Sequence, residues 1–207
     1  MAILHAATIS PTKAEAISQW LPGQAWAPKS ADPVNVVGSF RFDDPEGSVG
    51  LEVHLVELGD VLLQVPLTYR DAPLDGAGEH LVTQMQHSVL GTRWVYDALR
   101  DPVFTRVLAA VTMTGCGQAV GLVEHSGRWL VVPTSVRLVG GGLDERVPVD
   151  GFALQSDAAD WAVLRNDRFE LRFARRPVAG DRPPIALTAT WPGQDVPVVL
   201  AAVSVTD

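Results

Sequence analysis

The alternation of hydrophobic and polar positions predicts antiparallel strands along most of this chain. The clearest example is a hairpin in which leucine and valine at positions 51, 53 and 55 alternate with Glu52 and His54. Gly59-Asp60 makes the turn, and residues 61–69 return as the partner strand. Because neighbouring side chains of a strand point to opposite faces, we expect His54 to face solvent.

The same reading predicts ten further strands, each flanked by turn-forming residues. They are expected at 34–42, 81–90, 92–96, 119–124, 128–132, 135–139, 161–164, 168–174, 185–191 and 196–205. Gly91, Ser126-Gly127 and Asn166-Asp167 are the expected breaks and tight turns between neighbouring strands.

Two segments have helical spacing. In the first, Thr12 and Glu15 have the spacing of a capping box ahead of an apolar face, and Pro22-Gly23 ends the helix. In the second, Asp101-Pro102 is a strong helix start, and an apolar stripe follows as far as Gly115-Cys116-Gly117. Helix and strand are mixed before this point, and the remainder is nearly all strand. We therefore expect an α+β protein with domains at 1–115 and 116–207.

Composition narrows the function classes. The chain has 207 residues, 47% hydrophobic residues and a net charge of -8, which is typical of a globular protein and argues against general affinity for nucleic acid or anionic membranes. A single cysteine, Cys116, excludes an intramolecular disulfide and a cysteine-based zinc cage. There is no signal-like N-terminus and no apolar run of about 20 residues, so we expect a cytoplasmic protein.

The polar motifs give little sign of catalysis. The five histidines lack metal-ligand spacing, and the side chains of His87 and Ser88 should diverge as strand neighbours. Gly140-Gly141-Gly142 lacks the lysine and helix of a phosphate loop, so a flexible hairpin is the simpler interpretation. The pairs Asp43-Asp44, Asp144-Glu145 and Arg175-Arg176 are interpreted as solvated turns and a solvated strand end. We expect no catalytic residue, metal or cofactor.

The tryptophans suggest a candidate ligand surface. Trp20 and Trp26 flank the end of the first helix, and Trp94 follows Arg93. Indole rings beside Gln24 and Arg93 could stack on a sugar, although large aromatic residues at such places more often fill the core.

These residues carry a family resemblance. Residues 20–29, from Trp20 through Gln24 and Trp26 to Lys29, resemble a motif in the N-terminal cap of actinobacterial maltokinases and related aminosugar kinases, with Ala25 and Ala27 in place of the usual arginine and aromatic residue. Residues 64–70 and 87–97 are also similar to cap segments, the latter most of all to stand-alone cap-like proteins of actinobacteria. The resemblance implies a cystatin-like cap, a curved antiparallel sheet against a helix.

The second half resembles the kinase-N-lobe-like intermediate subdomain of the same family. Arg172 stands where active members have a phosphate-binding lysine, and arginine is not a conservative replacement there. Alternation places Arg172 on a face with Arg168 and Glu170, where it could point into a cleft. Pro183-Pro184 and a strand-like segment stand in place of the expected helix, and we expect no catalytic lobe.

The resemblance therefore implies a non-catalytic accessory or regulatory protein of maltose, trehalose and α-glucan metabolism, acting on a partner enzyme or as a homodimer. The candidate ligand or partner surface consists of Trp20, Gln24, Trp26, Lys29, Arg93, Trp94 and Arg172. Three alternatives stay open: a pseudokinase-like binder of a nucleotide or sugar, a remnant of a carbohydrate kinase, and a transferase completed by a separate C-lobe chain.

Overall fold

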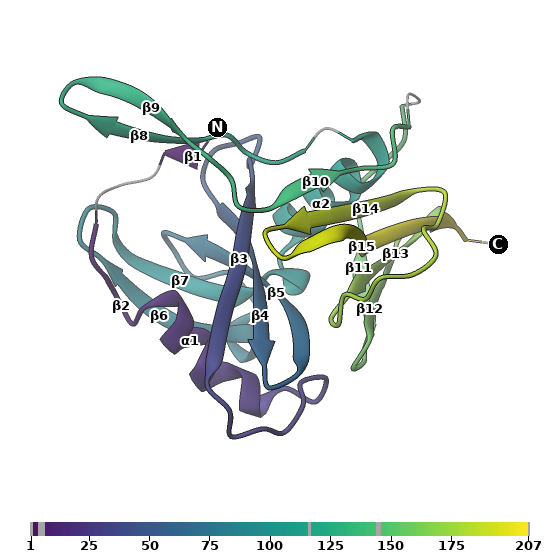
Figure 1. Ribbon diagram of the computed structural model, residues 1–207, viewed down its shortest axis with the longest axis horizontal. Coiled ribbons are helices and arrows are strands. Elements are labelled where there is room, and N and C mark those ends of the chain that lie inside the picture. Colours follow the sequence, from purple (N-terminus) through teal and green to yellow (C-terminus); the bar gives the residue numbers. More distant parts are fainter. Residues whose placement is uncertain (1, 4–6, 116, 144–145, 207) are drawn as a thin grey trace.

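The computed structural model describes residues 2–3, 7–115, 117–143 and 146–206. Within these ranges the fold is α+β with few helices, as expected, and most of the chain forms strands. Two six-stranded antiparallel sheets face each other, and a smaller three-stranded sheet projects from the body (Figure 1).

The first sheet has the strand order β2-β6-β7-β5-β4-β3 and curls around the first helix. Its strands are β2 (Ile9–Ser10), β3 (Val34–Phe42), β4 (Gly50–Leu58), β5 (Val61–Arg70), β6 (Leu81–His87) and β7 (Gly91–Asp97). Helix α1 (Lys13–Trp20) begins with the predicted capping box between Thr12 and Glu15 and continues into the short 3-10 turn η1 (Leu21–Gly23). Two more 3-10 turns, η2 (Gly78–His80) and η3 (Ala98–Arg100), precede β6 and the second helix.

The second sheet has the order β10-β14-β15-β13-β12-β11. Its strands are β10 (Arg137–Val139), β11 (Ala153–Asp157), β12 (Trp161–Arg165), β13 (Phe169–Ala174), β14 (Ala186–Trp191) and β15 (Gln194–Val205). Helix α2 (Pro102–Thr114) lies against β14 and β15, although it comes from the first half of the chain. The domain boundary predicted at 115/116 therefore falls directly after a helix that packs on the second sheet.

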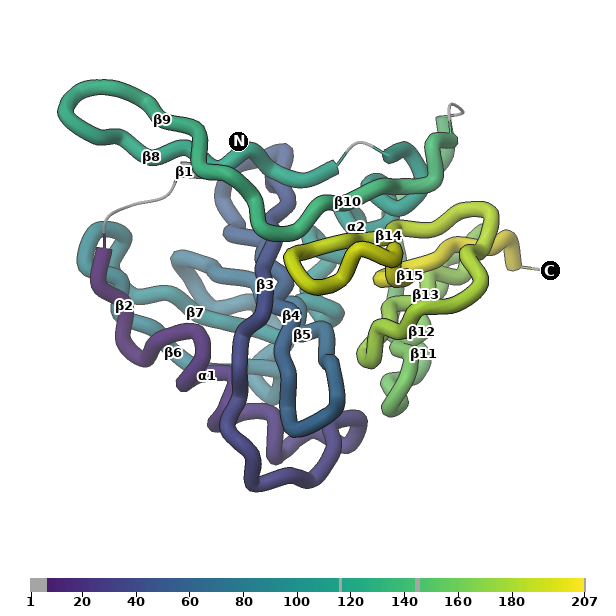
Figure 2. The backbone as a smooth tube through the Cα atoms, viewed as in Figure 1, coloured from purple at the N-terminus to yellow at the C-terminus, as the bar shows by residue number. Residues whose placement is uncertain are grey.

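The third sheet is an arm. Strand β8 (Gly121–His125) and strand β9 (Arg128–Val132) form a hairpin around the predicted Ser126-Gly127 turn, and β1 (Ala2–Ile3) pairs with β8 in parallel. The hairpin extends away from both larger sheets (Figure 2).

One hydrophobic core joins the two large sheets. Successive side chains of a strand point to opposite faces of the sheet. Leu51, Val53 and Leu55 of β4 therefore lie on one face, and Glu52, His54 and Val56 lie on the other. The first set packs in a cluster with α2 and with buried residues of the second sheet such as Phe173. The second face is covered by α1 and the segment after it. Strand β4 is therefore buried on both faces.

A buried arginine links the two sheets. The interpretation of Arg175 as a solvated strand end is wrong, because its side chain is 0% exposed. Its guanidinium donates from Nη2 to Asp97 Oδ2 at 2.8 Å, and from Nε and Nη2 to the two oxygens of Asp157 at 2.9 and 2.8 Å. It also stacks on Trp26, with 4.1 Å between Cζ and the ring centroid. Neither acid is near Arg175 in the sequence, so only tertiary structure reveals the pairing.

The glycine run also has a different role from the one expected. The N–H of Gly141 donates to Thr112 O, and that of Leu143 to Met113 O, each at 2.7 Å, so the segment satisfies carbonyls at the C-terminus of α2. A Cβ atom on Gly140 would lie 2.4 Å from Val111 O, which is too close for any side chain. Residues 140–142 are therefore packed against a helix end and form neither a hairpin nor a phosphate cradle.

Other differences from the sequence predictions are local. The strand expected at 81–90 ends at His87, because Gly91 has a φ of 74° and residues 88–90 form a turn. Strands β1, β2 and β11 had no predicted counterpart. Each is short or carries few apolar residues, so the alternation signal is weak there.

Candidate functional site

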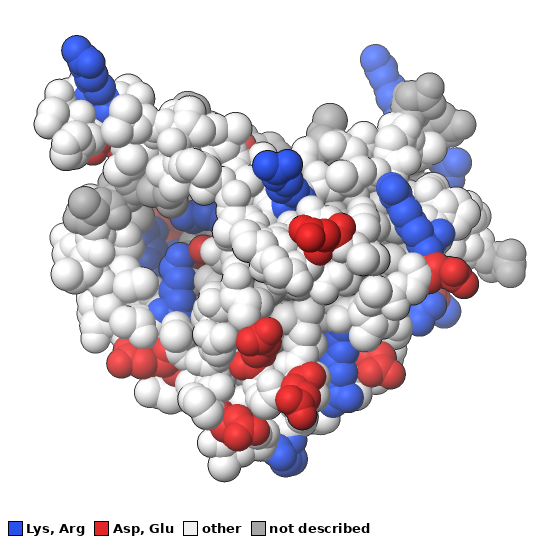
Figure 3. Space-filling view, viewed as in Figure 1, with Lys and Arg blue, Asp and Glu red and all other residues white. Residues whose placement is uncertain are grey.

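The main candidate site is a cavity of about 520 Å³ on the α1 side of the first sheet. Its walls come from the N-terminal segment before α1, the loop between β3 and β4, and the inner faces of β5, β6 and β7. This volume is within the range of small-molecule sites, about 300–1,000 Å³. Figure 3 shows Lys and Arg side chains gathered at a hollow beneath the arm, over this part of the sheet.

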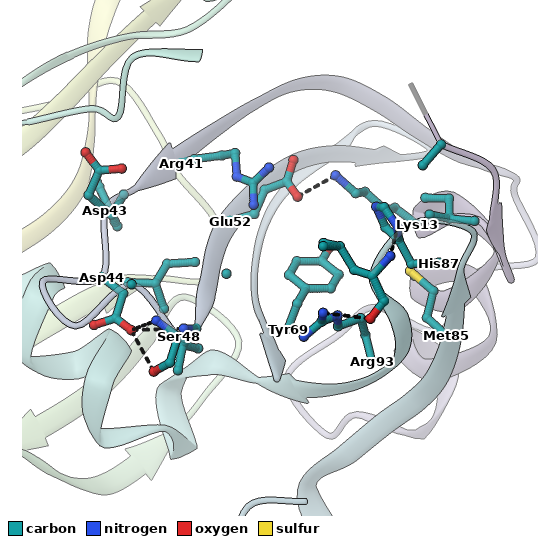
Figure 4. A pocket seen from close by; sticks show the side chains of 18 residues that line it. Lys13, Arg41, Asp43, Asp44, Ser48, Glu52, Tyr69, Met85, His87 and Arg93 are labelled. Atoms are coloured by element: carbon teal, nitrogen blue, oxygen red, sulfur yellow. Dashed lines mark hydrogen bonds and ion pairs between the residues drawn. The ribbon is translucent and has the colours of Figure 1, made fainter. Parts of the chain in front are cut away.

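A buried polar cluster forms one wall. Lys13 Nζ donates to Glu52 Oε2 at 2.5 Å (Figure 4). Glu52 Oε2 also lies 3.8 Å from His54 Nε2. His54 Nε2 is 3.2 Å from the hydroxyl of Tyr69, whose ring lies beneath the Lys13 ammonium. The prediction that His54 faces solvent is therefore wrong. Glu52 and His54 are polar positions on a face that α1 and the segment after it cover, and His54 is 2% exposed.

Burial controls protonation in this cluster. Loss of solvation lowers the pKa of His54 to about 4 against the opposing effect of Glu52, so the imidazole is neutral at neutral pH. Burial alone would raise the pKa of Glu52, but His54, Lys13 and Arg41 outweigh it and the pKa lies below its ordinary value. Burial, together with the Glu52 carboxylate, raises the pKa of Tyr69 well above its ordinary value. At neutral pH the cluster thus holds one ammonium–carboxylate pair and neutral rings.

Two arginines add charge to the cavity. Arg41 stands opposite Glu52 in the pairing of β3 with β4, and Arg93 stands opposite Met85 in the pairing of β6 with β7. Arg93 Nη2 donates to Leu90 O at 2.7 Å, whereas the buried Nε atoms of Arg41 and Arg93 have no hydrogen-bond partner among the described residues. Of the charged residues that line the cavity, only Arg93 belonged to the candidate surface predicted from the sequence. The register of the β3–β4 pair, which places Arg41 beside Glu52, was the signal that could have revealed these two residues.

The acidic pair Asp43-Asp44 lies at the opposite end of the cavity from Lys13 and Arg93 (Figure 4). Asp44 accepts hydrogen bonds from the backbone N–H groups of Glu46, Ser48 and Val49 and from the Ser48 hydroxyl. Although burial opposes it, this set of donors lowers the pKa of Asp44. The carboxylate holds the β3–β4 loop in place, which the interpretation as a solvated turn did not include.

The residues of the candidate surface predicted from the sequence lie in separate parts of the structure. Trp26 is buried, and Trp20 packs edge-on against it with 5.9 Å between ring centroids. Gln24 donates to Trp20 O at 3.4 Å, and Lys29 Nζ donates to the carbonyls of Pro22 and Gln24 at 2.6 and 3.4 Å. The motif at residues 20–29 thus shapes its own loop and fills the core beneath α1.

Arg93 and Trp94 are not part of this loop, and they lie on opposite faces of β7. Arg93 shares the face of Val95, which packs beneath α1, whereas Trp94 shares the face of Arg70 and Tyr96. The three tryptophans of the suggested sugar platform therefore do not form one surface.

Arg172 lies apart from both groups. The alternation along β13 is as expected, with Phe169, Leu171 and Phe173 buried and Arg172 exposed. Its guanidinium stacks on Trp161, with 4.7 Å between Cζ and the ring centroid. Arg172 lines neither the main cavity nor a second hollow near Lys29.

In the part of the chain that the structure describes, no group of three or more His, Cys, Asp or Glu residues could hold a metal ion. No helix within this part is long and apolar enough to cross a membrane. Cys116 and the acidic pair Asp144-Glu145 lie outside the described residues.

Comparison with known proteins identifies one relationship. Residues 20–101 match the maltokinase N-terminal cap domain family, which confirms the resemblance expected from residues 20–29 and 87–97. The match includes β3 to β7 and ends at Asp101, the N-cap of α2. No curated protein matches the chain.

Proposed function

Taking the maltokinase N-terminal cap match of residues 20–101 as the premise, we propose that this protein is a non-catalytic cap-like module of maltose, trehalose and α-glucan metabolism. It acts by binding a partner enzyme. The observation that carries the proposal is the arm formed by β8 and β9, which presents apolar side chains to solvent.

The arm has the features of a docking element. Trp129, Leu130 and Val131 of β9 are 55%, 47% and 66% exposed, and they are consecutive, so they occupy both faces of the hairpin. Strand β9 is also the last strand of its sheet among those described, which leaves one edge of its backbone free to pair. Exposed apolar strands with a free edge are sites of strand addition and protein association.

The partner surface that fits the arm is a strand edge beside an apolar depression. The tip of the hairpin carries Glu124, His125 and Arg128, so its polar end would remain at the rim while the β9 side chains are buried. We propose that an enzyme of the maltokinase type supplies this surface. Pairing of the arm with a second copy of the chain is the alternative outcome.

The non-catalytic assignment rests on β13 and the chain that follows it. Phosphoryl transfer requires a positioned cation near the phosphates and a partner group that holds it. Here Arg172 is exposed, and its guanidinium stacks on Trp161. Strand β13 is followed by β14, where the family resemblance implies a helix.

The test is binding of the full chain to a purified maltokinase, measured by calorimetry. The variant Trp129→Glu/Val131→Lys should weaken binding about tenfold or more, because it places charges in a desolvated interface. Val178→Lys is the matched control, since Val178 is 65% exposed but lies outside the arm, and it should bind as the native chain does.

Two results would count against the proposal: no binding to the maltokinase, or binding that the arm variant leaves unchanged. Phosphate transfer that appears only when this chain is mixed with a separate C-lobe chain would support a transferase completed by that chain instead. Light scattering on the native chain and the arm variant tests the homodimer, which predicts a dimer that the arm variant converts to a monomer.

A further inference from the structure

The cavity on the α1 side of the first sheet plays no part in the proposed docking through the arm, yet charged side chains line it. From its charges and its walls, we propose that it binds a phosphate monoester with a small apolar organic group. The phosphate would lie among Lys13, Arg41 and Arg93, and the organic group would lie against Tyr69 and Met85, which border the same part of the cavity.

The charges at this end of the cavity leave an excess of positive charge. Among the residues that the structure describes here, Lys13, Arg41 and Arg93 are the cations and Glu52 is the carboxylate they face, and His54 is neutral at neutral pH. The other two carboxylates, Asp43 and Asp44, lie at the far end, where Asp44 accepts four hydrogen bonds from its own loop. The local excess of about two charges matches a phosphate monoester, which carries about -1.5 to -2 at neutral pH.

Neither arginine is fully engaged by the protein. The buried Nε atoms of Arg41 and Arg93 have no hydrogen-bond partner among the described residues, and because they are buried, a ligand in the cavity would be bound through the terminal Nη groups. Arg93 is already oriented by its bond to Leu90 O, so part of the ordering cost of binding has been met before the ligand arrives. Arginine is also the side chain best suited to oxyanions, because its planar fork can donate two parallel hydrogen bonds.

Space and apolar surface explain why an organic group should accompany the phosphate. A Cβ atom on Gly50 would lie 3.4 Å from Arg41 Nη2 and 3.3 Å from Tyr69 Cβ, so the absence of a side chain there lets Arg41 and Tyr69 lie close to the β4 backbone without filling the cavity. The remaining wall includes Ile9, Met85 and Leu90. A cavity of about 520 Å³ is much larger than a phosphate ion requires.

Isothermal titration of the full chain tests the proposal with phenyl phosphate as the probe. Three other compounds serve as comparisons with phenyl phosphate. Inorganic phosphate lacks the ring, benzoate carries a single negative charge, and benzyl alcohol carries no charge. Phenyl phosphate should bind saturably and about tenfold more tightly than each comparison.

Arg41→Met and Arg93→Met keep an apolar stem and should each weaken phenyl phosphate binding about tenfold or more. Arg172→Met, on an exposed arginine outside the cavity, should leave binding unchanged. If the methionine variant at position 41 does not fold, Arg41→Lys keeps the charge without Nε and should bind with intermediate affinity.

No saturable binding of phenyl phosphate would overturn the proposal, and so would equal binding of benzoate or inorganic phosphate. An equal loss in Arg172→Met would also overturn it, because the effect would then be general electrostatics. The titration contains no partner enzyme, so its failure leaves the proposed role of the arm unaffected.

Discussion

Replacement of Arg175 should destabilise the protein more than replacement of any exposed arginine, because it leaves two carboxylates facing each other in the interior. In the native structure the guanidinium donates three hydrogen bonds to Asp97 and Asp157 and is fully buried. Removing one member of a buried ion pair costs about 3–5 kcal/mol, since the remaining charge loses its compensation without regaining water. Arg175→Met, which also loses the stacking on Trp26, should therefore lower the free energy of unfolding by about 4 kcal/mol.

Urea denaturation followed by tryptophan fluorescence measures this loss. For a chain of this size, about 4 kcal/mol corresponds to a fall in Tm of roughly 8–16 °C. Arg172→Met is the control, because Arg172 lies three residues away on β13 and stacks on Trp161 at the surface. Its loss should cost less than about 1 kcal/mol.

The triple variant Arg175→Met/Asp97→Asn/Asp157→Asn separates a charge effect from a packing effect. It removes all three charges, and an asparagine at position 97 can still accept the Leu99 N–H that Asp97 now accepts. If uncompensated charge causes the loss, the triple variant should recover most of the stability of the native chain. A loss below about 1 kcal/mol in Arg175→Met, or a triple variant no more stable than the single one, would refute the reasoning.

Three further predictions concern other parts of the molecule. Gly140→Ala should lower the free energy of unfolding by about 1–3 kcal/mol, because the new Cβ atom would clash with Val111 O. Gly180→Ala has open space around it and should change this free energy by less than about 0.5 kcal/mol. Chemical denaturation of the two variants measures the difference. The pKa of His54 is about 4 in the folded protein, below its ordinary value of about 6.5. As the pH falls, the imidazole is therefore protonated in the unfolded chain before it is protonated in the folded protein, which favours unfolding. Stability should fall by about 3 kcal/mol as the pH drops from 6.5 to 4, and denaturation at several pH values should give a flatter profile for His54→Gln than for the native chain. Asp101 accepts two hydrogen bonds from Arg70 and one from the Val103 N–H at the start of α2, so Asp101→Ala should cost about 3 kcal/mol and Asp101→Asn less; equal Tm values for the two variants would contradict this.

Local signals predicted the elements of this fold well. The capping box of Thr12 with Glu15, the proline after Asp101 and the turn at Gly59-Asp60 depend on residues a few positions apart, and each is present as expected. Strand β3 has its predicted bounds for the same reason. Where apolar residues are few, as in β11, alternation has nothing to detect, and the strand was missed.

The candidate site could not be predicted in the same way, because burial depends on what covers a face. The polar face of β4 was read as solvent-facing, and only the position of α1 and the segment after it turns Glu52 and His54 into a buried cluster. Arg175 shows the same limit. It is separated by 78 residues in sequence from Asp97, and no local pattern connects them.

The pairing of Arg175 with Asp97 also bears on how freely the cap can be moved between proteins. Residues 20–101 match a family of cap domains, yet Asp97 within this stretch is neutralised by an arginine outside it, and the Leu51 face of the sheet is covered by α2. A chimaera that received residues 20–101 alone would inherit an unpaired acid and an uncovered apolar face. Any host for this cap would have to supply both a cation and a cover of its own, so the matched stretch does not by itself make a transplantable unit.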